Sequence, residues 1–159
     1  QLLTLSRIQS GEFKADIRLL NISNCISDVL LKFEGLAAVA NKQLIFDQAL
    51  SDVMVLADES LLSMALSNLL SNALRYAKST VSIKAAVHGT KISIIVKDDG
   101  QGIDAVDLPH IFERFYKGKQ GHFGLGLAIV RSCVDLMHGE VVAYNDSGAV
   151  FEIRLNTKK

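Results

Sequence analysis

The chain has 159 residues, balances 17 Lys and Arg against 17 Asp and Glu, and is 49% hydrophobic. This length suits one domain with its own core, and the apolar content excludes a disordered chain. The neutral charge balance argues against a nucleic-acid-binding protein, which would carry a basic surface. The two cysteines, Cys25 and Cys133, lack metal-binding spacing. We expect both to pack as small apolar side chains, in a protein of a reducing compartment.

The first residues are typical of the end of a helix that begins upstream. Leu2, Leu5 and Ile8 have helical spacing, and Ser10-Gly11 closes the pattern. Because the chain starts in mid-pattern and without Met, we expect a piece of a longer protein. No apolar run is long enough to cross a bilayer, so we expect this piece to make no membrane contact.

The next elements alternate between short strands and long helices. A strand is expected at 17–22, followed by a helix that Ser23 caps and that ends near Ala40. Strands are expected at 44–46 and 53–56. Asp58 then caps a helix to about residue 77, with three stripes along it. The core stripe comprises Leu62, Leu66, Leu69 and Ala73. The water-facing stripe comprises Ser63, Ser67 and Ser71. The third stripe is polar and comprises Asn68, Asn72 and Arg75.

The second half begins and ends with a hairpin. Strands at 81–87 and 92–96 flank a Gly turn, and strands at 141–144 and 150–155 flank Asn145 to Gly148. Between the two hairpins we expect a turn at 98–102 and a short helix at 104–112, interrupted by Pro109. A polar loop at 116–123 and an amphipathic helix at 127–137 follow. Hairpins mixed with helices predict an α+β two-layer sandwich with helices on one sheet face.

Asn68 and Asn72 are unusual in a helix of Leu, Ala and Ser, because Asn is a poor helix former. Mg²⁺ prefers oxygen ligands and shares them with substrate phosphates, so the Asn72 amide oxygen suits such a site. Asparagines that only bond to nearby loops remain an alternative.

Asp98 follows a β-branched strand and is succeeded by Gly100 and Gly102. A carboxylate held there could accept a hydrogen bond from the adenine amino group, whereas guanine would oppose it with a carbonyl oxygen. The two glycines would let the backbone approach the base closely. An ordinary Asp-Gly turn is the alternative.

Gly124 and Gly126 precede the 127–137 helix, where exposed N–H groups can bind phosphate. Nearby cations are further phosphate partners, unless they are simply solvated; they are Arg75, Arg114 and Lys117. Tyr76 could line the nucleotide or simply pack. Phe112 and Phe115 are expected mainly to anchor the loop that follows, although Phe115 could also line the nucleotide.

The order of these blocks resembles the catalytic, ATP-binding domain of bacterial sensor histidine kinases, whose superfamily includes gyrase, Hsp90 and MutL ATPases. The blocks are N-L-L-S-N-A-L-R-Y, D-D-G-Q-G-I, I-F-E-R-F-Y-K-G and G-L-G-L-A-I-V. The resemblance covers residues 17 to 155. It implies a mixed sheet of about five strands with about three helices on one face, and ATP and Mg²⁺ as cofactors.

The resemblance also assigns roles. Asn72 would ligate the metal, Asn68 would support the phosphates, and Asp98 would read adenine. Arg114 and Lys117 would approach the phosphates from the side of a short lid at 116–123, and Arg114 would join the two asparagines as a catalytic residue. The remaining nucleotide-binding positions would be Arg75, Tyr76, Gly100, Gly102, Ile103, Tyr116, Lys117, Gly124, Leu125, Gly126 and Leu127.

Two departures from the family pattern stand out. His122 occupies a position that is usually Gly in the last block, and none of the four histidines has the context of a phosphoacceptor. Residues 1–12 would be the end of the helical dimerisation and phosphoacceptor domain, and 13–159 the ATP-binding domain. We expect phosphoryl transfer to a histidine on that separate domain, an indirect response-regulator partner, and a cytoplasmic location in a membrane-anchored parent.

Two other functions fit the same motifs. Hydrolases of this superfamily place a Glu one helical turn before the metal-binding Asn, where it activates water; here that residue is Asn68, which cannot take a proton. A nucleotide-binding module with a regulatory role only would need the motifs without the transfer reaction.

Overall fold

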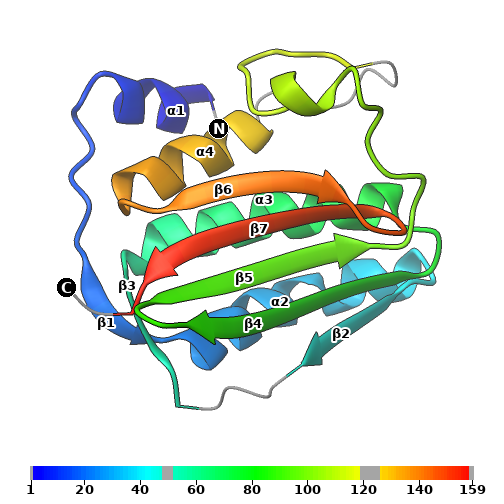
Figure 1. Cartoon of the computed structure of the whole chain (residues 1–159), viewed down its shortest axis with the longest axis horizontal. Helices are drawn as coiled ribbons and strands as arrows, with labels where there is room; N and C mark the ends of the chain where they lie inside the picture. The colour runs from blue at the N-terminus through cyan, green and yellow to red at the C-terminus, as the bar shows by residue number, and fades with distance from the viewer. Residues whose placement is uncertain (1, 48–51, 119–125, 158–159) are drawn as a thin grey trace.

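The computed structural model describes residues 2–47, 52–118 and 126–157. Its helices are α1 (Leu2–Gln9), α2 (Ile22–Val39), α3 (Glu59–Tyr76) and α4 (Gly126–Leu136), with a 3-10 turn η1 (Leu108–His110). Its strands are β1 (Arg18–Asn21), β2 (Gln43–Asp47), β3 (Met54–Ala57), β4 (Thr80–His88), β5 (Lys91–Asp98), β6 (Glu140–Asn145) and β7 (Ala149–Asn156). Figure 1 shows α2 and α3 behind one twisted sheet.

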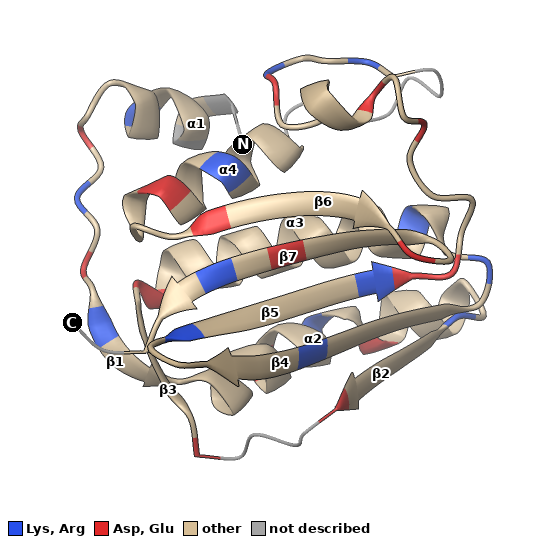
Figure 2. Ribbon diagram, viewed as in Figure 1, with Lys and Arg blue, Asp and Glu red and all other residues tan. Residues whose placement is uncertain are grey.

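The sheet has five strands in the order β2-β4-β5-β7-β6. Strands β2 and β4 are parallel, and the other neighbours are antiparallel, so the sheet is mixed. Strands β1 and β3 form a separate two-stranded sheet. The expected α+β two-layer sandwich is confirmed. The sheet leaves its other face open, and acidic and basic residues are interspersed along the ribbon (Figure 2).

The core lies between this sheet and the helices. Most residues of β5 and β7 are buried, with Ile92, Ile94 and Val96 of β5 among them, and so is the predicted core stripe of α3. The predicted water-facing stripe is only partly correct, because Ser71 is exposed but Ser63 and Ser67 are half-buried. Helix α3 contacts α2 on one flank and α4 on the other, so little of its surface is left to water.

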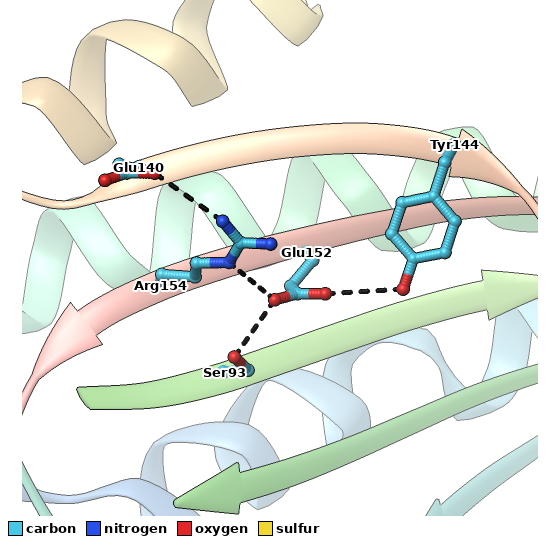
Figure 3. A network of polar contacts seen from close by, with 5 residues as sticks. All are labelled: Ser93, Glu140, Tyr144, Glu152 and Arg154. Atoms are coloured by element: carbon cyan, nitrogen blue, oxygen red, sulfur yellow. Dashed lines mark hydrogen bonds and ion pairs between the residues drawn. The ribbon is translucent and has the colours of Figure 1, made fainter. Parts of the chain in front are cut away.

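The open face of the sheet holds a polar network across three strands (Figure 3). Glu152 accepts hydrogen bonds from the Ser93 hydroxyl at 3.0 Å, the Arg154 Nε at 2.7 Å and the Tyr144 hydroxyl at 3.3 Å. Glu140 pairs with Arg154 at 3.6 Å. Burial opposes the charge on Glu152, but the bonds from Arg154 and Ser93 outweigh it and lower its pKa. The network therefore ties β5, β6 and β7 together where helices do not cover them.

Helix α2 begins earlier than expected. Its N-cap is Asn21, whose side chain accepts a bond from Asn24 N at 3.1 Å, and the prediction of Ser23 is wrong. Asn21 is the last residue of β1 and is already extended, so its side chain reaches the first free N–H groups of the helix. The strand expected at 17–22 is correspondingly shorter, Arg18–Asn21.

The short helix expected at 104–112 is wrong, since only the three residues of η1 are helical there. Asp104 accepts a bond from Val106 N at 3.0 Å, which favours a turn over a helix. Pro109 then limits further helix formation, because it has no N–H to donate.

The Asp58 carboxylate joins two distant segments. Its Oδ1 accepts a bond from Leu61 N at 2.9 Å, which caps α3 as predicted. Its Oδ2 accepts one from Asp16 N at 2.8 Å, in the segment that leads into β1. Asp58 is buried, so both bonds are shielded from water.

Replacing Asp58 by Ala should lower the free energy of unfolding by about 2 kcal/mol, because a helix cap and a second buried bond are lost. Asp58→Asn keeps one oxygen acceptor and should lose about half as much. Urea denaturation of both variants tests this. Equal stability of Asp58→Ala and the wild type would contradict the assigned contacts.

Candidate functional site

Asp98 is the last residue of β5 and is only 2% exposed. Its Oδ1 accepts bonds from Gly100 N at 2.8 Å and from Ala149 N at 3.3 Å. Its Oδ2 is buried and has no hydrogen-bond partner among the described residues. A buried carboxylate oxygen without a donor is costly, so this atom is suited to accept a bond from a ligand.

The electrostatics of Asp98 follow from this burial. Loss of water raises the pKa of the carboxyl, and the bonds from Gly100 and Ala149 offset the effect in part. The neighbouring Asp99 charge adds to the rise, while Lys42 opposes it. The Lys42 ammonium donates to the Leu74 carbonyl near the end of α3, so a positive charge is fixed at this end of the site.

The predicted glycines serve close contacts within the protein. A Cβ at Gly100 would lie 2.2 Å from the Tyr76 carbonyl oxygen, so only Gly lets this loop meet the end of α3. Gly102 has a φ of 81°, and its Cβ would lie 2.8 Å from Asn145 Oδ1. The two glycines therefore let the loop that follows β5 pack closely against the end of α3 and against the end of β6.

The polar stripe of α3 lies beside the start of α4. Asn68 and Asn72 are half-buried, and Arg75 is exposed. The Asn68 amide donates to the Met64 carbonyl at 2.9 Å. A Cβ at Gly126 would lie 3.1 Å from Asn68 Oδ1, so the first residue of α4 sits close to that amide. The fold thus brings together two of the predicted blocks that are far apart in sequence.

The residues after η1 have contacts that the sequence did not predict. The Arg114 guanidinium donates to Gln9 Oε1 of α1 at 2.7 Å and lies over the Phe115 ring. Phe115 is 57% exposed with a φ of 62°, so its prediction as an anchor is wrong. Phe112 does pack, edge to face with Phe151 at 6.2 Å between ring centroids.

The remaining predicted positions differ in accessibility. The Tyr116 hydroxyl donates to Asp107 Oδ1 at 2.7 Å, and Lys117 is exposed. Ile103 and Leu127 are buried. Gly124 and Leu125 lie outside the described residues, as do His122 and the rest of the predicted lid beyond Gly118.

Sequence reasoning missed three residues that support this site. Asp99 accepts bonds from Ser79 N at 3.0 Å and from the Ser79 hydroxyl at 2.8 Å, and these donors hold its pKa far below the usual range; Lys78 N donates to it as well, at 2.8 Å. Asn145 and Gly148 contact the 98–103 loop from the β6–β7 turn. Their only signal was a turn-forming sequence, which does not reveal the partner across the sheet.

The donor set for a metal is small. No group of three His, Cys, Asp or Glu side chains that could hold an ion occurs among the residues that the structure describes. An oxygen-seeking cation at Asn72 would therefore take most of its ligands from a bound molecule, as Mg²⁺ does with nucleotide phosphates. Within the described part of the chain, no helix has the length and apolar character to span a membrane.

Comparisons with known proteins agree with this geometry. Residues 57–159 match the family described as histidine kinase-, DNA gyrase B-, and HSP90-like ATPase. The sensor-like histidine kinase SenX3 of Mycobacterium tuberculosis is 34% identical over 156 residues, which cover 93% of this chain and 38% of that relative. The sensor protein KdpD of Escherichia coli is 34% identical over 163 residues, 97% of this chain and 18% of that relative.

Solved structures show the same fold. The histidine kinase AdeS of Acinetobacter baumannii has a TM-score of 0.82 at 25% identity, covering 99% of this chain and 76% of that one. Full-length ShkA in complex with AMPPNP has a TM-score of 0.85 at 25% identity, covering 97% of this chain and 34% of that one. The chain therefore belongs to the histidine kinase-, DNA gyrase B- and HSP90-like ATPase family and is the ATP-binding domain of a histidine kinase.

Proposed function

We propose that this domain binds Mg²⁺-ATP and transfers the γ-phosphoryl group to a histidine on a separate helical domain of its parent protein. The buried, half-satisfied carboxylate of Asp98 carries the proposal, since it provides one acceptor at the edge of a site that α3 and α4 also border. The adenine amino group would donate to Asp98 Oδ2. Guanine would bring a carbonyl oxygen to the same atom and leave both acceptors unpaired.

The polar stripe of α3 would meet the phosphates. Asn72 would hold Mg²⁺ through its amide oxygen, with phosphate oxygens as the other ligands, and the ion would neutralise charge during transfer. Asn68, Arg75 and the N-terminus of α4 would support the phosphates. Arg114 and Lys117 would approach from the lid side, for which Arg114 must exchange its bond to Gln9 for one to phosphate.

Asn68 favours transfer over hydrolysis. In the related hydrolases a Glu at this position activates water, and an amide cannot accept a proton from water. Phosphoryl transfer depends mainly on positioning and charge, so it needs no base on this helix.

The rest of the parent protein would supply the phosphoacceptor domain and the contacts with partners. The chain spans about two fifths of SenX3, 38%, so the whole protein's activity and partners are proposals. We take residues 1–12 as the end of the dimerisation and phosphoacceptor domain, with a response regulator as the eventual acceptor. We also propose a cytoplasmic location in a membrane-anchored parent, where ATP is available.

The transfer reaction can be tested with labelled ATP. The isolated chain should incorporate little label from the γ-phosphate, because it lacks an acceptor histidine, and a supplied histidine-bearing helical domain should become labelled. A steady ATPase rate without transfer would favour the hydrolase. Binding with neither reaction would favour a regulatory module.

Mutations can test the contacts to the base and to the metal separately. Asp98→Ala should weaken ADP and ATP alike by about tenfold or more, because it removes a contact to the base. Asn72→Ala should mainly remove the gain in affinity that Mg²⁺ confers. Calorimetry with and without Mg²⁺ measures both, with the neighbouring exposed Ser71→Ala as the control. Unchanged affinity in both variants would overturn the site assignment.

The raised pKa of Asp98 predicts a pH dependence of binding. The base needs an unprotonated acceptor, so affinity is complete above that pKa and is lost as pH falls through it. As the pH falls from neutral into the acidic range, the ADP affinity of the wild type should decline more steeply than that of Asp98→Asn. The variant controls for titration of the ADP phosphates. Parallel pH profiles would contradict the role of Asp98.

A further inference from the structure

We infer that Asn145 is a positioning residue for base selectivity, a role that rests on the proposed function of Asp98. Asn145 ends β6, which is separated in sequence from the Asp98–Ile103 loop. Its Oδ1 accepts a bond from Ile103 N at 2.7 Å, and its Nδ2 donates to Ile103 O at 2.7 Å. One side chain therefore satisfies both backbone groups of a single loop residue, as a neighbouring strand would.

This double contact requires an amide. An aspartate would set a negative oxygen against the Ile103 carbonyl, and the single oxygen of a hydroxyl could not align with both the N–H and the C=O of Ile103. Gly102 closes over the same side chain, since its Cβ would lie 2.8 Å from Asn145 Oδ1. The loop is thus held at its far end by Asn145 and cannot shift without breaking both bonds.

The rest of the β6–β7 turn holds the other end of the loop. Ala149 N donates to Asp98 Oδ1 at 3.3 Å. A Cβ at Gly148 would lie 2.0 Å from the Asp98 carbonyl oxygen, so the turn and the end of β5 are in close contact there. With Oδ1 occupied in this way, Oδ2 is the oxygen left for a base. The turn fixes which carboxylate oxygen faces the ligand, and Asn145 fixes the loop beside it.

Asn145 touches the loop backbone and acts through Asp98. Its loss should release the 98–103 loop, let Asp98 rotate and weaken the preference for adenine, while phosphate contacts from α3 and α4 remain. A purely structural role would lower the affinity for every nucleotide equally. The ratio of ADP to GDP affinity therefore distinguishes the two roles.

The experiment measures ADP and GDP binding by calorimetry for the wild type, Asn145→Ala and Asn145→Ser, with thermal unfolding to confirm folding. Asn145→Ala should reduce the ADP affinity by about tenfold with little effect on GDP. Asn145→Ser keeps one of the two bonds, so its ADP affinity should lie between those of the wild type and Asn145→Ala. This variant preserves the test if Asn145→Ala unfolds. Asp146→Ala is the matched control, because it changes the same turn and removes only an exposed ion pair with Lys97.

Asp98→Asn, alone and combined with Asn145→Ala, separates this inference from the proposed function. If Asp98→Asn abolishes selectivity and the second change adds nothing, Asn145 acts through Asp98. If Asp98→Asn abolishes selectivity but Asn145→Ala leaves the ratio unchanged, or lowers both affinities equally, the inference on Asn145 alone is overturned. If Asp98→Asn leaves selectivity intact, the adenine role of Asp98 fails, and that of Asn145 with it.

Discussion

The burial of one carboxylate governs the architecture of this site. Asp98 is almost inaccessible, and its charge is opposed by loss of water, yet only one of its oxygens is bonded within the described protein. A group of this kind is costly in the free domain and becomes favourable when a ligand donates to it. The surrounding loop, turn and helix end hold the carboxylate in that state, which is the basis of the base selectivity proposed for this site.

Helix α3 is the second support of the site. Asp58 fixes its first turn and also binds the segment that leads into β1, while the carbonyl of Tyr76 at its last turn receives Gly100. Between these ends, Asn68 and Asn72 are carried on a helix whose apolar residues are buried. The residues proposed to meet the metal and the phosphates therefore take their position from the packing of α3.

Local patterns predicted the elements well where periodicity was strong. The hairpins, α3 with its Asp58 cap and the two-layer arrangement are confirmed, because alternation and helical spacing reflect burial directly. The predictions for Ser23, residues 104–112 and Phe115 were wrong where neighbours decide. An extended Asn21 takes the cap first, a side-chain bond of Asp104 and Pro109 limits the helix, and Phe115 is left outside the core.

The sequence by itself determined the family: four ordered blocks carry the asparagines, the aspartate and the glycines, and their types and order are sufficient to indicate an ATP-binding domain of a histidine kinase. Only the tertiary structure decided what holds them. Asn145 meets Ile103 across 42 positions of sequence, Arg114 meets Gln9 across 105, and Gly148 meets Asp98. Such contacts arise from sheet pairing and helix packing, which bring together residues that no local pattern relates.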